Sequence, residues 1–196
     1  MKLSKYNKTS TRGFTLIELL VVIAIIAALG GLSFGPIMKF LTTADLTKTT
    51  KVCKDLTFAI TGFEQEYDSL PYTGTSGYPA DDSLEKTDTN ELLNVLMGND
   101  PLINDKNKIF FKADQAKGSK DGLVYTGSNV TSLLDKWGNA YHILLDYSGD
   151  GELNATNIGP AATGISYKTE LHVDDAIAAS PGRDSTFNDE QDAKSW

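Results

Sequence analysis

One segment constrains the fold of this chain more than any other, because residues 19–38 form 20 consecutive positions without a charge. As an α-helix with a rise of about 1.5 Å per residue, this segment would reach about 30 Å, the thickness of the hydrocarbon core of a bilayer. The sequence therefore predicts a single helix that is long and apolar enough to cross a membrane.

The charges on the two sides of this segment differ in sign. Residues 1–13 contain Lys2, Lys5, Lys8 and Arg12 and no acidic residue. In the rest of the chain acidic residues outnumber basic ones, so that the net charge of the whole chain is −8. Because basic residues next to a membrane-spanning helix stay in the cytoplasm, the N-terminus is predicted to be cytoplasmic and the acidic remainder to lie outside. An acidic body also argues against a nucleic-acid-binding protein, whose surface must match the phosphate backbone.

Glu18 stands directly before the apolar segment. An unpaired, ionised carboxylate in lipid costs about 3 kcal/mol, so an acid at this place predicts a function and a cationic partner. A new α-amino group, formed by cutting the chain before Phe14, would be such a partner. A secretory signal peptide is the alternative, but the small-residue cleavage site that it needs after the apolar segment has only a loose match here.

Residues 12–22, RGFTLIELLVV, resemble the prepilin cleavage and methylation motif of type IV pilins and type II secretion pseudopilins. The resemblance implies that a prepilin peptidase cuts between Gly13 and Phe14 and N-methylates Phe14. It also implies that Glu18 pairs with the Phe14 amine of a neighbouring subunit during assembly. Residues 1–13 are then a leader that is removed, and residues 14–38 a transmembrane helix that becomes the filament core.

Glycines and Pro36 interrupt the apolar segment near its end and lower its helical stability. Either the helix ends there, or it kinks and resumes, as the resemblance to pilins implies. Apolar residues then recur at steps of three and four from Val52 to Tyr67, which predicts an amphipathic helix over residues 39–70. Its end is expected at residues 68–70, because Pro71 disfavours a helical residue before it.

Residues 71–196 are predicted to form an extracytoplasmic α+β head, in which the long helix packs on a small antiparallel sheet in a pilin-like fold. A short helix is expected at residues 90–97, closed by Gly98, and short strands or extended segments at residues 109–111 and 123–125. Residues 164–173 alternate in polarity and are predicted to pair with the strand that begins near Tyr141.

Residues 134–143, LDKWGNAYHI, resemble the D-P-W-G-N-P-Y block of major pseudopilins, with Lys136 and Ala140 in place of the two prolines. From the residues alone, the block predicts a hairpin with a buried aromatic side chain. Cys53 is the single cysteine, so no intrachain disulfide can form. Type IV pilins usually have a C-terminal cysteine pair, which this chain lacks.

Two acidic loops are candidates for calcium, an ion that prefers six to eight oxygen ligands. Residues 180–196 resemble the C-terminal calcium loop of major pseudopilins, which implies Asp184 as a ligand together with Asp189 or Asp192. Residues 146–154 follow the opening pattern of an EF-hand-like loop, with candidate oxygens on Asp146, Ser148, Asp150, Glu152 and Asn154. A hairpin turn at Asp150-Gly151 and a solvated acidic tail are the alternatives.

The sequence has no glycine-rich phosphate loop and no Ser, Cys or acidic residues placed beside its two histidines as a triad, so no enzyme activity is predicted. The favoured function is that of a structural subunit of a type II secretion pseudopilus, a periplasmic filament anchored at the bacterial inner membrane. Its expected partners are further copies, other pseudopilins, the inner-membrane assembly platform and the prepilin peptidase. A type IV pilus subunit for adhesion, motility or DNA uptake, and a membrane-tethered extracytoplasmic binding domain, are the alternatives.

Overall fold

A computed structural model describes residues 13–71, 83–87, 91–127, 129–159, 171–172, 175–187 and 191–196. The chain divides into two compact units, residues 1–42 and residues 43–196. We call the first the N-terminal unit and the second the head, and describe each by itself.

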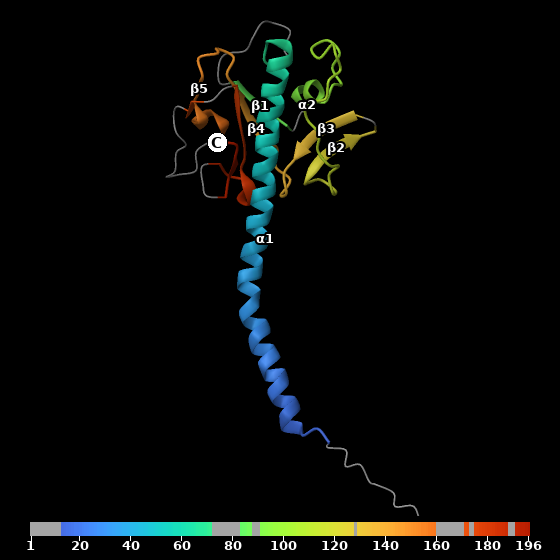
Figure 1. Cartoon of the computed structure of the whole chain (residues 1–196), viewed down its shortest axis with the longest axis vertical. Coiled ribbons are helices and arrows are strands. Elements are labelled where there is room, and N and C mark those ends of the chain that lie inside the picture. The colour runs from blue at the N-terminus through green and yellow to red at the C-terminus, as the bar shows by residue number, and fades with distance from the viewer. Residues whose placement is uncertain are drawn as a thin grey trace, which may run out of the picture. The chain divides into compact units, whose positions relative to one another are not determined.

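The longest element is helix α1, Leu16–Tyr67, which contributes residues to both units (Figure 1). The glycines and Pro36 in the apolar segment do not end the helix, whose backbone is helical throughout. The helix ends one residue before the predicted range, because Asp68 takes a left-handed conformation with φ of 55° and Pro71 follows closely.

In the N-terminal unit, every residue from Gly13 to Leu32 is exposed. In the head, the predicted apolar stripe of α1 is confirmed, because Leu56, Ala59, Ile60 and Phe63 are all buried while Val52 and Tyr67 pack against the same cluster. Burying one such side chain contributes about 1.5–3 kcal/mol to stability. The stripe therefore anchors the second half of α1 to the head.

The main sheet of the head has four antiparallel strands in the order β1-β4-β7-β8. These strands are β1 at Ser83–Lys86, β4 at His142–Leu145, β7 at Ala176–Ser180 and β8 at Ala193–Lys194. A hairpin of β2, Gly122–Thr126, and β3, Asn129–Leu134, stands apart from this sheet, as does the short pair β5, Glu152–Leu153, and β6, Leu171–His172. The predicted α+β class with antiparallel strands is confirmed.

Both faces of strand β4 are covered. Ile143 and Leu145 join the core cluster that includes the α1 stripe, whereas Leu144 joins a second cluster with Leu153 and Phe187. A strand buried on both faces reads as a continuous apolar run, which explains the sequence His-Ile-Leu-Leu. The second cluster holds the C-terminal loop and the 3-10 helix η1, Ala155–Ile158, against the sheet.

Three local predictions can be compared with the described residues. Helix α2, Glu91–Leu96, falls within the predicted helix, and Gly98 follows it with φ of +76°. Residues 109–111 are an extended segment rather than a strand, with Phe111 buried. The predicted pairing of residues 164–173 with the strand after Tyr141 is wrong for the described part, because β6 pairs with β5. Strand β4 pairs instead with β1 and β7. The small side chains of β7 fit between the two core clusters.

Candidate functional site

The predicted cleavage position lies just before the first turn of α1. Gly13 and Phe14 have no regular secondary structure, and both are exposed, Phe14 with 79% of its surface accessible. No described atom outside the neighbouring residues lies within 4 Å of where a Cβ on Gly13 would stand. A protease can reach the peptide bond between these residues without unwinding the helix.

Glu18 closes the first turn of α1 by a reciprocal contact with Thr15. The Thr15 backbone N–H and the Thr15 Oγ1 both donate to Glu18 Oε2, at 2.8 and 2.7 Å, and the Glu18 N–H donates to Thr15 Oγ1 at 3.3 Å. This is a capping box, which satisfies backbone donors at a helix start that would otherwise lack a partner. This role of Thr15 was not predicted, although the pattern T-x-x-E before an apolar run is the sequence signal of a capping box.

The capping box orients the Glu18 carboxylate, which is predicted to pair with the Phe14 amine of a neighbouring subunit. Both contacts from Thr15 use Oε2, and no other described residue donates to Oε1. Glu18 also lines a shallow cavity of about 340 Å³ together with Phe14, Ile17, Val21 and Val22. A cation from another molecule can therefore approach Oε1 in an apolar setting while Oε2 stays engaged in the cap.

In the head, the buried carboxylate of Asp135 organises the Trp137-Gly138-Asn139 turn. Its Oδ1 accepts hydrogen bonds from the backbone N–H groups of these three residues, at 2.8, 2.7 and 2.8 Å. Its Oδ2 accepts one from Ser180 Oγ at 2.6 Å. Asp135 is fully buried, so these donors supply the compensation that a buried charge needs.

The same turn holds the C-terminal loop in place. Asn139 Nδ2 donates to the Gly182 carbonyl oxygen at 2.7 Å, and Ser185 Oγ donates to Asn139 Oδ1 at 2.8 Å. The loop begins with the 3-10 helix η2, Gly182–Asp184, and has no disulfide to hold it. These hydrogen bonds and the one from Ser180 to Asp135, which together we call the polar latch, join the block that resembles the pseudopilin motif to the C-terminal loop. Asp135 and Ser180 both stand in the predicted blocks, but the contact between them was not predicted.

The candidate calcium residues of the C-terminal loop are described in part. Asp184 is exposed, and its carboxylate accepts hydrogen bonds from the Thr186 N–H at 3.0 Å and from Gln191 Nε2 at 3.3 Å. Asp192 is buried, with 6% of its surface accessible. Asp189 lies outside the described residues. A ligand set at this loop stays a prediction.

The candidate oxygens of residues 146–154 bond mostly to the loop itself. Asp146 accepts hydrogen bonds from Ser148 Oγ, the Gly149 N–H and the Gly151 N–H, at 3.0, 2.8 and 2.7 Å. Likewise, the Glu152 N–H donates to Asp150 Oδ1, and the Thr156 N–H donates to Asn154 Oδ1. Across the described ranges, no three or more His, Cys, Asp or Glu side chains gather as a metal site would require.

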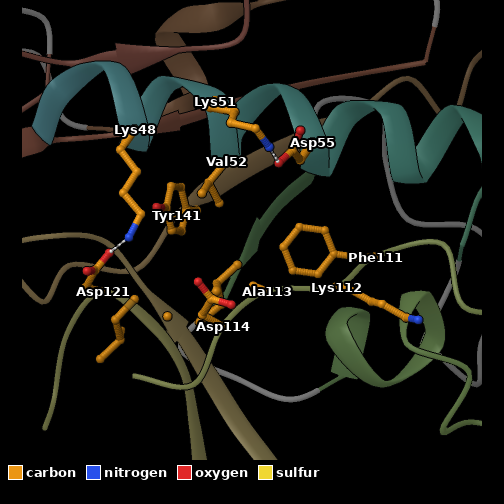
Figure 2. Close-up of a pocket in the computed structure, with 13 residues that line it drawn as sticks. Lys48, Lys51, Val52, Asp55, Phe111, Lys112, Ala113, Asp114, Asp121 and Tyr141 are labelled. Atoms are coloured by element: carbon orange, nitrogen blue, oxygen red, sulfur yellow. Dashed lines mark hydrogen bonds and ion pairs between the residues drawn. The ribbon is translucent and has the colours of Figure 1, made fainter. Parts of the chain in front are cut away.

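A further pocket in the head, of about 350 Å³, lies between α1 and the segment before β2 (Figure 2). Lys48 Nζ lies 2.8 Å from Asp121 Oδ1, and Lys136 Nζ lies 2.9 Å from Asp121 Oδ2. Burial would raise the pKa of Asp121, but the hydrogen bonds from the two lysines outweigh it and lower the pKa. These charges serve to join α1 to the hairpin.

Tyr141 lines this pocket, and Cys53 follows the lining residue Val52 on α1; both side chains are buried. Burial raises the pKa of the Cys53 thiol and also that of the Tyr141 hydroxyl, far above their ordinary values. The thiol therefore stays protonated and donates to the Ala193 carbonyl oxygen, at a sulfur–oxygen distance of 3.6 Å. Both side chains belong to the packing of the head.

In comparisons with known proteins, the family model of the prokaryotic N-terminal methylation motif matches residues 8–34. No curated protein and no solved structure matches the chain. Among the described residues, no helix combines the length and apolar character that crossing a membrane requires. The matched range contains Gly13, Phe14 and Glu18, so it covers the predicted cleavage position, the residue predicted to be methylated and the capping box. The motif indicates a type IV pilin-like protein of the prepilin type.

Proposed function

We propose that this chain is a subunit of the pseudopilus of a type II secretion system. A prepilin peptidase would remove residues 1–13 and methylate the amine of Phe14. The mature chains would then associate through residues 14–38 into a filament that carries the heads on its outside. The observation that supports this proposal most is the methylation motif at residues 8–34, together with a Glu18 carboxylate that the capping box holds at the helix start.

Membrane insertion is part of the proposal. The uncharged residues 19–38 match a bilayer in length, and the basic residues before them favour a cytoplasmic N-terminus. Glu18 would enter the apolar core of the filament only when its Oε1 meets the Phe14 amine of another copy, since a lone buried charge is costly. The inner-membrane assembly platform and other pseudopilins are the proposed partners in this step.

Two features of the head favour a secretion pseudopilus over a type IV pilus. The Asp135–Asn139 turn, which resembles the block of major pseudopilins, holds the C-terminal loop by hydrogen bonds from Asn139 and Ser180. The only cysteine, Cys53, is buried in the core, so the loop has no disulfide partner of the kind that type IV pilins usually use. A type IV pilus subunit remains the second candidate, because both classes share the N-terminal motif.

Deletion of the gene in its own host separates the candidates. A pseudopilin deletion should leave folded export substrates in the periplasm while surface pili stay normal in electron micrographs. Complementation with the wild-type chain should restore export, and complementation with Gly13→Val should not. Loss of pili with normal export would support the type IV pilus instead. Normal export and normal pili would favour the tethered binding domain.

A further inference from the structure

We propose that a lysine-rich surface of the head binds the acidic surface of a second copy of the same chain. The lysine surface extends along the head, from Lys106 and Lys108 beside Glu66 near the end of α1 to Lys117 and Lys120, with Lys112 between them in the sequence. Lys120 stands next to Asp121, which pairs with Lys48 about five helical turns before Glu66. The acidic surface consists of Asp150 and Glu152, and of the acids Glu64, Asp68 and Asp175 around a neighbouring concavity. This inference rests on the proposed function, since it names the contact by which assembled heads would recognise one another.

The lysine surface has the opposite charge to the protein as a whole. Residues 106–120 contain five lysines and a single acid, Asp114, although acids outnumber bases 26 to 18 in the whole sequence. All five lysines are exposed. Lys106 and Lys108 share one partner, Glu66, whereas Lys112, Lys117 and Lys120 form no ion pair with a described residue. The surface therefore keeps a positive charge that the head itself does not neutralise.

These lysines are held on an ordered backbone. The Phe110 and Phe111 N–H groups donate to the Leu96 carbonyl oxygen, and the Lys117 N–H donates to the Lys120 carbonyl oxygen in a tight turn. Figure 2 shows Lys112 extending away from the pocket residues Phe111 and Asp114. A charged side chain on a fixed backbone loses less entropy on binding than one on a free loop, so the surface is suited to specific docking.

Apolar side chains near Lys106 and Lys108 in the sequence favour a protein partner. Ile109 lies between Lys108 and Phe110 in sequence with 55% of its surface exposed, and Leu102, shortly before, is 92% exposed. A site for small anions needs only donors and charge, whereas protein interfaces combine an apolar centre with a charged rim. The partner is therefore expected to bury Ile109 and to present acids around it.

The acidic surface has the matching character. A concavity of about 370 Å³ is lined by Glu64, Asp68, Asp146 and Asp175, and no basic residue lines it. Beside it, Asp150 in the loop before β5 and Glu152 at the start of β5 are exposed. In Figure 1, β5 lies on one side of the head part of α1, and α2, β2 and β3 lie on the other. The two charged surfaces are therefore different patches of the same head.

Two different, complementary patches on one subunit make a head-to-tail contact, which leads to an open helical array when it does not close into a ring. This geometry suits a filament made of one type of subunit. Without such a contact, heads with a strong negative charge would repel one another when brought close together. A second copy is the one partner that filament assembly itself supplies in high local concentration.

The test exchanges the charges between the two surfaces in the full-length chain, expressed in cells that process it. The readout is the yield of sheared filaments relative to total processed protein. Lys117→Glu with Lys120→Glu should lower the yield at least about tenfold, and Asp150→Lys with Glu152→Lys should do the same. Combining all four substitutions should restore the yield to within about threefold of wild type, because opposite charges face each other again.

The Asp150→Lys, Glu152→Lys variant separates complementarity from general repulsion. This variant makes the head less negative, so an account based on repulsion alone predicts a higher yield, whereas the proposal predicts a lower one. A higher yield would overturn the proposal. So would a fourfold variant that assembles as poorly as its two parents, since the lysine surface would then contact something other than the acidic surface of a second copy.

A matched control tests whether any added negative charge has this effect. Lys117→Gln with Lys120→Gln changes the net charge by −2, as does Thr126→Glu with Asn129→Glu at the exposed tip of the β2–β3 hairpin. The first pair should lower the yield severalfold and the second should not. Equal yields from the two would contradict the proposal. If wild-type chains keep residues 1–13 and form no filament, the proposed function itself fails, whereas normal filaments from every lysine variant refute only this inference.

Discussion

The apolar stripe of helix α1 is buried in the head, whereas the described apolar side chains of the N-terminal unit are exposed. In the head, Leu56, Ile60 and Phe63 are at most 1% exposed, because strands and loops of the same chain cover them. In the N-terminal unit, Leu16 and Leu32 are 82% and 77% exposed, and so are their apolar neighbours to a large degree. A contiguous apolar surface of this kind indicates a site of interaction with other molecules.

The two units differ in whether their own residues cover their apolar side chains. The head has its own core and a polar latch around Asp135, so its stability depends on internal contacts. The N-terminal unit has a capped helix start, and none of its described side chains is buried, so we expect lipid or further copies to cover its apolar surface. Substitutions in the head should therefore change stability, and substitutions in the N-terminal unit should change processing and assembly.

The largest effect is expected at the cleavage position. Gly13→Val should abolish processing, because a β-branched side chain crowds the bond that the peptidase must cut, while the head remains folded. The measurement is the intact mass of the membrane-extracted chain together with its melting temperature. Efficient removal of residues 1–13 from this variant would contradict the predicted position of the cut.

The next effect concerns the charge of Glu18. Glu18→Ala should be processed and yet form at least about tenfold fewer filaments, because removing one partner of a buried pair costs roughly 3–5 kcal/mol. Glu18→Gln is the sharper variant, since glutamine preserves the capping box with Thr15 but carries no charge.

We expect Glu18→Gln to assemble as poorly as Glu18→Ala, with normal processing in both, as judged by sheared-filament yield. Wild-type yield from Glu18→Gln would show that the cap, and not the ion pair, is the function of this residue.

In the head, Asp135→Ala should lower the free energy of unfolding by about 3 kcal/mol, because it leaves several buried N–H groups and the Ser180 hydroxyl without an acceptor. For a domain of this size, that corresponds to a fall in melting temperature of about 6–12 °C. Calorimetry on the detergent-solubilised full chain measures it. Asp114→Ala, at an exposed acid, is the matched control and should change the melting temperature by less than about 2 °C.

The smallest expected effect is the response to calcium. If the C-terminal loop binds the ion through Asp184, calcium at 100 times its dissociation constant should add about 2.7 kcal/mol to the stability of the head. Melting with calcium and with chelator should then differ by about 5–10 °C in wild type and not in Asp184→Ala. If only Asp150→Ala removes the difference, the ion sits in the loop of residues 146–154. An unchanged wild-type melting temperature would refute both sites.

Sequence patterns predicted the elements whose signals are local. An unbroken apolar run predicted a helix over residues 19–38, and apolar residues at steps of three and four predicted the stripe from Val52 to Tyr67. The short helix before Gly98 was predicted from its amphipathic pattern and the glycine that follows it. The processing motif could also be recognised in the sequence, because its residues are contiguous. The capping box was accessible too, since Thr15 and Glu18 are three residues apart.

Contacts between distant residues could not be predicted in the same way. The partner of strand β4 was misassigned because the small side chains of Ala176–Ser180 give no alternating pattern when both faces are buried. The latch joins Asp135 to Ser180 and Asn139 to Gly182, over 45 and 43 residues, so its members become visible only in the folded head. The same holds for the acidic surface, which collects residues from separate segments.

The most direct test of the contrast between the two units is the intact mass of the protein purified from sheared filaments. The account predicts a chain of residues 14–196 whose Phe14 amine carries one methyl group, recovered from filaments. A chain that retains residues 1–13 and is recovered only as a monomer from membranes would contradict it.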